Sequence, residues 1–274
     1  MNLNFSNLPS RSSKTRSKGL TIIQDKGSAL ESIEKFISSS GHHVDFARIS
    51  PASLCSAVPL ANRVKKYLEA DIIPLMSGII FEAAFIRDDV DKYLHMLESA
   101  GIDHIELSDS VVEIKPEQKA EMIRELSDRF TIFSKIGPKI KTMSFRYQEW
   151  KDYILAETGA GSKKIIIEGG ETGTLPVFSG KAQINVPLIN HILKFASIED
   201  TVWEAPGEEQ QIWFITRFGS EVNLADIDPL KVPALESHRN GISWQTFRNN
   251  ISVKDTGDKK LRSTDPIFET DFQL

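Results

Sequence analysis

Charged and polar side chains recur along this chain at the points where short apolar runs end. Taken singly, each of them could cap a helix or lie in a solvated loop. Several carboxylates gathered in one buried place are costly unless cations or a metal neutralise them, so a cluster would indicate a functional site. The candidates are Asp25, Lys26, Arg48, Ser77, Glu82, Glu106, Ser108, Asp109, Ser134, Lys135, Lys139, Glu168, Glu171, Glu204 and Asn223.

The metal ligands available among these candidates are oxygens. Carboxylate and water oxygens suit Mg²⁺, which keeps several waters that a substrate can displace. The histidines (His42, His43, His95, His104, His191 and His238) fall mostly on expected helices or at strand starts. A histidine zinc site or a Ser-His-Asp triad is therefore not expected. The predicted Mg²⁺ ligands are Glu106, Asp109, Glu168, Glu204 and Asp25.

The elements that must position these residues alternate between strands and helices. Parallel strands need long crossovers, so this alternation predicts βαβ units. Eight units predict an α/β fold of one domain, a (β/α)8 TIM barrel, whose reacting groups lie at the carboxyl ends of the strands. A doubly wound sheet is the alternative, but its glycine-rich turn after the first strand is absent. Expected strands cover 20–27, 44–50, 71–77, 104–110, 131–139, 163–171, 201–206 and 221–227, and expected helices cover 28–41, 56–69, 81–101, 115–129, 145–159, 185–196, 208–219 and 229–250.

Length and charge limit the function classes. The 274 residues fit one barrel with a flexible N-terminal leader (1–17), the barrel itself (18–250) and a charged C-terminal tail (251–274). The net charge of −5 argues against nucleic-acid or membrane-surface partners. Small anionic substrates are expected, with a homo-oligomer as an open possibility. The single cysteine, Cys55, fits a reducing compartment, so a cytoplasmic location is expected, although the leader also has some of the composition of a transit peptide.

Several motifs occur in the order found in the phosphosulfolactate synthase family, which the chain resembles from about residue 18 to 247. They are KGLTIIQDKG, IELSDS, KIGPK, IIIEGGETG, VWEAPGEEQQ, FGSEVNLADI and LESHRNG. The resemblance implies a (β/α)8 barrel that uses Mg²⁺ to add sulfite to phosphoenolpyruvate, giving (2R)-phospho-3-sulfolactate. It implies an enolate stabilised by the metal and protonated by Lys139.

Other residues are also expected to take part in the reaction. Lys26 and Arg48 join Lys139 as catalytic candidates. The substrate-binding candidates are Lys135, Ser108, Asn223 and Arg239.

The chain departs from the family pattern where anions would be held. Gly170 and Ser243 stand where the family has arginines, and Lys135 stands where it has a glutamate. Arginine is the preferred bidentate partner of phosphate, so these changes bear on the substrate. Two alternatives follow: a divergent enzyme with another nucleophile or another enol-type acceptor, and a non-catalytic relative similar to a plant heat-stress-associated protein.

Overall fold

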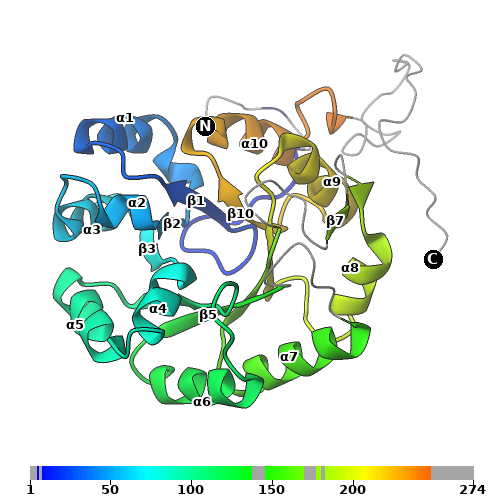
Figure 1. Ribbon diagram of the computed structural model, residues 1–274. Helices are drawn as coiled ribbons and strands as arrows, with labels where there is room; N and C mark the ends of the chain where they lie inside the picture. The colour runs from blue at the N-terminus through cyan, green and yellow to red at the C-terminus, as the bar shows by residue number, and fades with distance from the viewer. Residues whose placement is uncertain (1–4, 6–7, 138–145, 170–176, 180–182, 248–274) are drawn as a thin grey trace, which may run out of the picture.

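The computed structural model describes residues 5, 8–137, 146–169, 177–179 and 183–247. Its eight parallel strands close into one barrel in the order β1-β10-β9-β6-β5-β4-β3-β2. Figure 1 shows the helices arranged around this ring of strands. The (β/α)8 barrel predicted from the sequence is confirmed. The barrel strands are β1 (Thr21–Asp25), β2 (Phe46–Ile49), β3 (Ile73–Met76), β4 (His104–Leu107), β5 (Thr131–Ile136), β6 (Lys164–Ile167), β9 (Thr201–Glu204) and β10 (Asn223–Ile227).

Most helices lie at or near their expected positions, with three differences. The helix expected over 229–250 ends at Arg239, and a short helix over Pro51–Leu54 was not expected. The pattern over 81–101 forms two helices, because the chain turns between them through Asp88, which adopts a positive φ of 55°. The described helices are α1 (Leu30–Ser40), α2 (Pro51–Leu54), α3 (Leu60–Leu68), α4 (Gly78–Phe85), α5 (Val90–Ala100), α6 (Pro116–Leu126), α7 (Tyr147–Gly159), α8 (Val186–Ile192), α9 (Glu208–Phe218) and α10 (Val232–Arg239), with short 3₁₀ turns η1 (Gly41–His43) and η2 (Pro229–Lys231). A two-stranded pair, β7 (Phe178–Ser179) and β8 (Gln183–Ile184), lies between β6 and α8.

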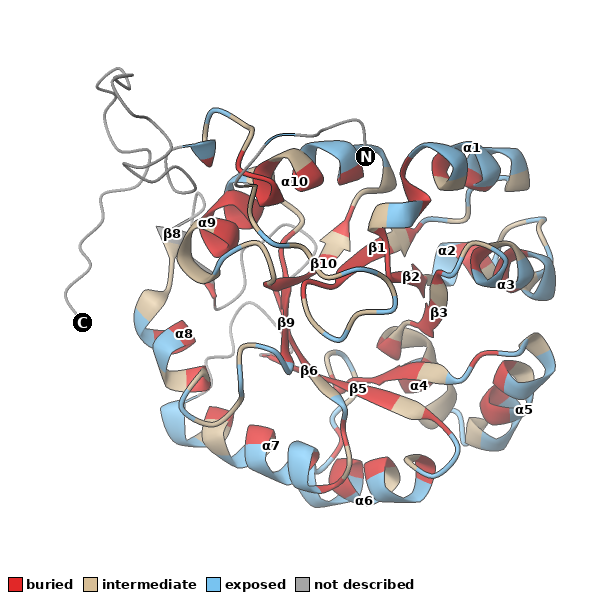
Figure 2. Cartoon of the chain, turned by 180° about the vertical axis from the view of Figure 1, so that it is seen from behind, coloured by how far each residue is buried: buried red, intermediate tan, exposed pale blue. Residues whose placement is uncertain are grey.

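Two apolar layers hold the barrel. The larger one packs the outer faces of the strands against the helices, and Figure 2 shows the strands as a buried centre. The smaller one fills the barrel interior. The interior layer consists of Leu20, Ile22, Phe46, Leu75, Phe133, Ile166, Val202 and Ala225. Side chains alternate between the two faces of a strand, so in a regular strand the residue two positions after an interior residue also points inward and lies nearer the carboxyl end of the barrel.

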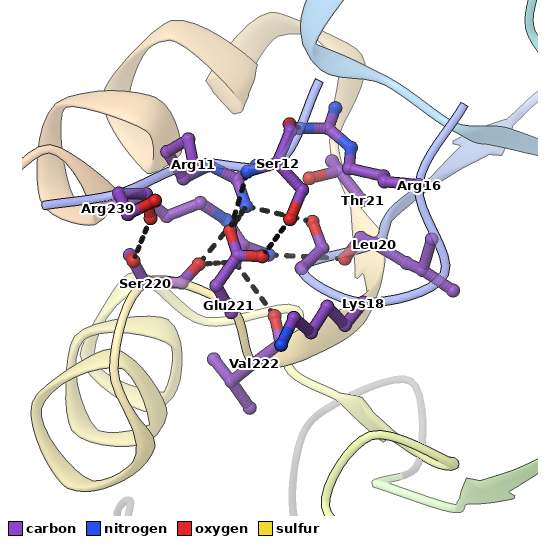
Figure 3. Close-up of polar contacts among 12 residues, drawn as sticks. Arg11, Ser12, Arg16, Lys18, Leu20, Thr21, Ser220, Glu221, Val222 and Arg239 are labelled. Carbon is purple, nitrogen blue, oxygen red and sulfur yellow. Dashed lines mark hydrogen bonds and ion pairs between the residues drawn. The ribbon is translucent and has the colours of Figure 1, made fainter. Parts of the chain in front are cut away.

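Residues 8–18 lie against the amino-terminal end of the barrel, where a flexible leader was expected. Arg11 contacts Glu221 and Glu236 at 3.1 and 2.9 Å, and Arg16 contacts Asp45 at 2.7 Å. The contacts of Arg11 and Ser12 with Glu221 are drawn in Figure 3. Because both arginine side chains are largely buried, this segment closes the barrel floor and is part of the folded domain. The expected tail (251–274) lies outside the described residues.

Within the described part of the chain, no helix is long and apolar enough to cross a membrane.

Candidate active site

A buried charged cluster occupies the carboxyl-terminal mouth of the barrel, directly above the apolar interior. The two-residue period carries the inward face from Phe46 to Arg48, from Phe133 to Lys135 and from the interior residues of β6 and β9 to their glutamates. Five of the predicted site residues meet here. They are Arg48 from β2, Glu106 from β4, Lys135 from β5, Glu168 just after β6 and Glu204 from β9.

Arg48 is bound by carboxylates from three strands. Its Nε donates to Glu106, and its Nη1 contacts Glu204 Oε1 at 3.1 Å and also Asp226 Oδ1. Burial alone would lower the pKa of Arg48, but Glu106, Asp226 and Glu204 outweigh it and raise that pKa. The guanidinium therefore stays charged, and none of the described residues accepts a hydrogen bond from its buried Nη2.

Lys135 forms the second half of the cluster. Its Nζ lies 3.0 Å from Glu204 Oε1 and 3.4 Å from Glu168 Oε1. Burial opposes the charge, yet Glu204 and Glu168 raise the pKa of Lys135, so the ammonium stays protonated. A lysine held in this state is suited to binding an anion and poorly suited to releasing its proton.

Glu204 forms ion pairs with both cations and accepts a hydrogen bond from the backbone. Its Oε2 accepts from the Gly169 amide at 3.0 Å. Glycine is required there, because a Cβ on residue 169 would lie 2.6 Å from the Glu204 carbonyl oxygen. Burial opposes ionisation, but Lys135, Arg48 and this amide together lower the pKa of Glu204, which stays ionised.

Asp226 belongs to the site although the sequence reasoning missed it. The β1–β10 register gains one residue on β10 between Leu224 and Ile227, and Asp226 there adopts a φ of 63°. This bulge turns the carboxylate into the mouth, where it accepts from Gln24 and Arg48. Burial and the nearby Glu204 raise the pKa of Asp226 to about 6. Its position near the end of the last apolar run was a signal that the sequence contained.

Asp25, predicted as a metal ligand, faces the helices instead of the mouth. Its two oxygens lie 2.9 and 2.8 Å from Arg63 Nη1, and it also accepts from Tyr67 and from the Gly27 amide. Arg63 and Tyr67 belong to α3, so the carboxylate joins β1 to its neighbouring helix layer.

Asp109 and Ser108 likewise contact supporting groups behind the mouth. Asp109 lies 3.2 Å from the ammonium of Lys119 on α6. The Ser108 hydroxyl donates to Glu82 on α4, which also accepts the backbone amides of residues 110–112. Glu82 thereby shapes the β4 loop, whose Ser110 donates to Glu168 at 3.0 Å.

Asn223 and Arg239, predicted to bind substrate, lie at the opposite end of the barrel. Asn223 is the first residue of β10 and bonds to the Leu20 amide and to the carbonyls of residues 199 and 201. Arg239 donates to the carbonyls of Leu20, Ser220 and Val222, as Figure 3 shows in part. Both side chains tie together the barrel floor, so the structure does not bring them to the mouth.

Four further positions from the sequence analysis are Lys26, Lys139, Gly170 and Ser243. Lys26 is exposed at the rim, 3.3 Å from Asp228. Lys139 and Gly170 lie outside the described residues. Ser243 is bonded to His238 Nδ1 at 2.6 Å, beyond the end of α10.

The charged cluster in the mouth fits a divalent metal ion that takes only one or two protein ligands. No group of three or more carboxylate, histidine or cysteine side chains placed to hold a metal occurs among the described residues. Four carboxylates nevertheless face two cations in the mouth, an excess of negative charge that suits a divalent cation. Mg²⁺ is often held by one or two carboxylates together with waters and substrate, so this donor set fits it.

A closed parallel barrel with ionised groups gathered at the carboxyl ends of its strands is the architecture of TIM-barrel enzymes. The profile of the family described as (2R)-phospho-3-sulfolactate synthase (ComA) matches residues 9–245. The chain belongs to this family.

Curated relatives agree with that assignment. A phosphosulfolactate synthase of Methanothermobacter thermautotrophicus is 31% identical over 87% of this chain and 95% of its own length. One from Bacillus subtilis is 28% identical over 88% of this chain and 96% of its own length. These relatives are enzymes, which makes the chain a member of an enzyme family.

Solved structures share the fold at low identity. A phosphonopyruvate hydrolase in complex with oxalate and Mg²⁺ has a TM-score of 0.51 at 12% identity, covering 86% of this chain and 88% of that chain. A 3-hexulose-6-phosphate synthase also has a TM-score of 0.51 at 12% identity, covering 82% of this chain and 100% of that chain. At this identity the likeness concerns the barrel alone.

Proposed function

We propose that this protein adds sulfite to phosphoenolpyruvate in a Mg²⁺-dependent reaction that yields (2R)-phospho-3-sulfolactate, as a carbon–sulfur lyase. The observation that carries the proposal is the pair of buried cations, Arg48 and Lys135, which share Oε1 of Glu204 in the mouth. The names of the curated relatives support the same reaction.

Both substrates are anions, and the mouth offers them fixed positive charge. Arg48 stays protonated and has a buried Nη2 that no described residue satisfies. A buried unsatisfied donor costs about 1–3 kcal/mol, which a carboxylate, phosphate or sulfite oxygen would recover. The Lys135 ammonium provides a second positive contact, either to the anion that Arg48 binds or to the other substrate anion.

One or two of Glu106, Glu168 and Glu204 would hold Mg²⁺ together with waters and substrate, and the positive charge of the ion would stabilise negative charge developing on the substrate carboxylate. Asp226 adds to the negative charge that the ion offsets. The chain's own contribution is orientation, since all four carboxylates are held by hydrogen bonds or ion pairs from other elements.

The chemical step makes one carbon–sulfur bond. The sulfur lone pair of sulfite attacks the methylene carbon of phosphoenolpyruvate, and the electrons of the carbon–carbon double bond move toward the substrate carboxylate. A proton then adds to the carbon that bears the phosphate, and no group leaves. We assign this proton to Lys139, which lies outside the described residues, because its KIGPK motif resembles the family segment that carries the proton donor. Lys135 is paired with two glutamates, which makes its ammonium a weaker acid.

The proposal is tested by incubating the protein with phosphoenolpyruvate, sulfite and MgCl₂ and measuring phosphosulfolactate by mass spectrometry. Product that requires all three components is expected, with loss of product for Arg48→Met. Arg16→Met serves as the control, since it removes a buried cation at the floor of the barrel. Absence of product, with no thermal shift from either substrate, contradicts the proposal. A thermal shift from phosphoenolpyruvate without product also contradicts it and favours another nucleophile.

A further inference from the structure

Lys119 is a buried charge outside the mouth that the proposed reaction does not use. It lies on α6 in the outer helix layer, and its side chain is 1% exposed. Its Nζ lies 3.2 Å from Asp109 Oδ1 and 2.9 Å from Glu157 Oε1 of α7. The same nitrogen donates to the backbone carbonyl of Lys135 at 2.8 Å. A residue of the helix layer therefore reaches the main chain of a mouth residue.

Stability alone does not account for this cluster. Removing an ammonium and its carboxylate partners from water is costly, and apolar side chains of similar volume are often as stable or more stable in such places. Burial also raises the pKa of Glu157, which shows that the carboxylate is held against its solvation preference. The arrangement is better explained by what Lys119 holds in place.

The Lys135 carbonyl, which accepts from Lys119, lies where β5 extends beyond the end of its pairing with β4. On the β4 side, the register ends with Leu107 opposite Ser134. On the β6 side, it continues through Lys135 and Ile136. Lys135 is thus beyond the last paired residue of β4, and Lys119 supplies a donor where the β4 ladder has stopped.

We propose that Lys119 is a positioning residue, which sets the Lys135 ammonium between Glu168 and Glu204 by holding the Lys135 main chain. This deepens the proposed function and rests on it, because it treats Lys135 as the group that binds an anionic substrate. The three contacts of Lys119 join its nitrogen, carried by α6, to the segment after β4, to α7 and to β5, so the end of β5 has little freedom to shift.

The test combines two variants and a control. Lys119→Met alone leaves Asp109 and Glu157 as buried carboxylates, so K119M/E157Q is made beside it to remove one of those charges. Arg16→Met is the matched control, since Arg16 is also a buried cation in an ion pair but lies at the floor of the barrel. Circular dichroism identifies a temperature at which all variants are folded.

The first readout is independent of catalysis. Lysines labelled with ¹³C at Cε are observed by NMR, and the Lys135 signal is assigned with Lys135→Met. In K119M/E157Q the signal is expected to move toward that of exposed lysines, while in Arg16→Met it stays at the wild-type position. An unchanged signal in K119M/E157Q overturns the proposal.

The second readout is kinetic, with phosphoenolpyruvate and sulfite as substrates. Misplacing Lys135 is expected to lower kcat/KM by about 10- to 100-fold, with no comparable change in Arg16→Met. Equal kinetic constants for K119M/E157Q and the control overturn the role in the reaction. If the NMR signal moves but the wild-type protein forms no product, positioning by Lys119 is supported and the proposed function has failed.

Discussion

Arg48 and Lys135 contact the same oxygen atom, Oε1 of Glu204, at 3.1 and 3.0 Å. Two cations from different strands are thereby held close together by one carboxylate. This relationship makes Glu204 the residue on which the geometry of the mouth depends, since without its charge the two cations would repel each other.

Glu204→Gln is expected to destabilise the protein and to weaken its binding of phosphoenolpyruvate. Removing one partner of a buried ion pair costs about 3–5 kcal/mol, because the remaining charges stay buried. Urea unfolding measures the loss of stability, and calorimetry with phosphoenolpyruvate measures binding. Arg16→Met again controls for a buried ion pair at the other end of the barrel. Wild-type stability and affinity in the glutamine variant would contradict the bridging role.

Asp226→Asn is expected to make stability less dependent on pH. The pKa of Asp226 is raised from 3.8 to about 6 in the folded protein. Between these values the folded protein binds more protons than the unfolded chain, so stability falls as pH rises through 6. The asparagine variant should therefore be more stable at pH 8, by up to about 3 kcal/mol, with the difference disappearing below pH 4.

The backbone at residue 226 provides the control for this prediction. Asparagine tolerates the left-handed conformation seen at φ 63°, whereas alanine there costs about 1–2 kcal/mol. Asp226→Ala should thus be less stable than Asp226→Asn at every pH, as measured by thermal unfolding. Parallel pH profiles for wild type and Asp226→Asn would show that this carboxyl is not responsible.

Asp25→Asn is expected to lower stability without altering the response to Mg²⁺. Its two oxygens accept from Arg63 behind the barrel, so the substitution leaves a buried guanidinium without its charged partner, at a cost of about 3–5 kcal/mol. Glu106→Gln is the contrasting variant, because Glu106 lies in the mouth. Titration of activity with MgCl₂ separates the two. A weaker Mg²⁺ response in Asp25→Asn would revive the metal-ligand interpretation.

Deletion of residues 1–17 is expected to destabilise the barrel from its floor. It removes Arg11 and Arg16 and leaves Glu221, Glu236 and Asp45 without those cations. A loss of at least about 3 kcal/mol is expected, which lowers the Tm by roughly 6 °C or more. Deletion of residues 1–7 keeps these ion pairs and should leave the Tm unchanged. Equal Tm values for the two deletions would contradict a stabilising role for residues 8–17 and would support the expected flexible leader.

The alternation of apolar runs and helical patterns was sufficient to predict the closed barrel. The reason is physical: parallel strands require crossovers, and eight such units close on themselves. The same reasoning placed Arg48, Glu106, Lys135, Glu168 and Glu204 at the strand ends, and the structure brings these five together.

The face on which a residue lies was harder to predict. Barrel strands are buried on both sides, so their sequences lack the polar and apolar alternation that would reveal which residues point inward. Asp25 therefore looked equivalent to Glu204, although it points to α3. Asn223 was taken for a strand end, whereas β10 begins there and runs on to Ile227.

The sequence by itself determined the barrel, its order of elements and the identity of most charged groups at its mouth. Only the tertiary structure decided which charges pair. The Arg48 guanidinium contacts carboxylates from three strands, and the Asp226 side chain turns inward through a one-residue bulge. The Lys119 ammonium donates to the Lys135 carbonyl from the helix layer. These relationships join residues far apart in the chain, and local patterns record neither the register between strands nor the partner that a buried charge finds across them.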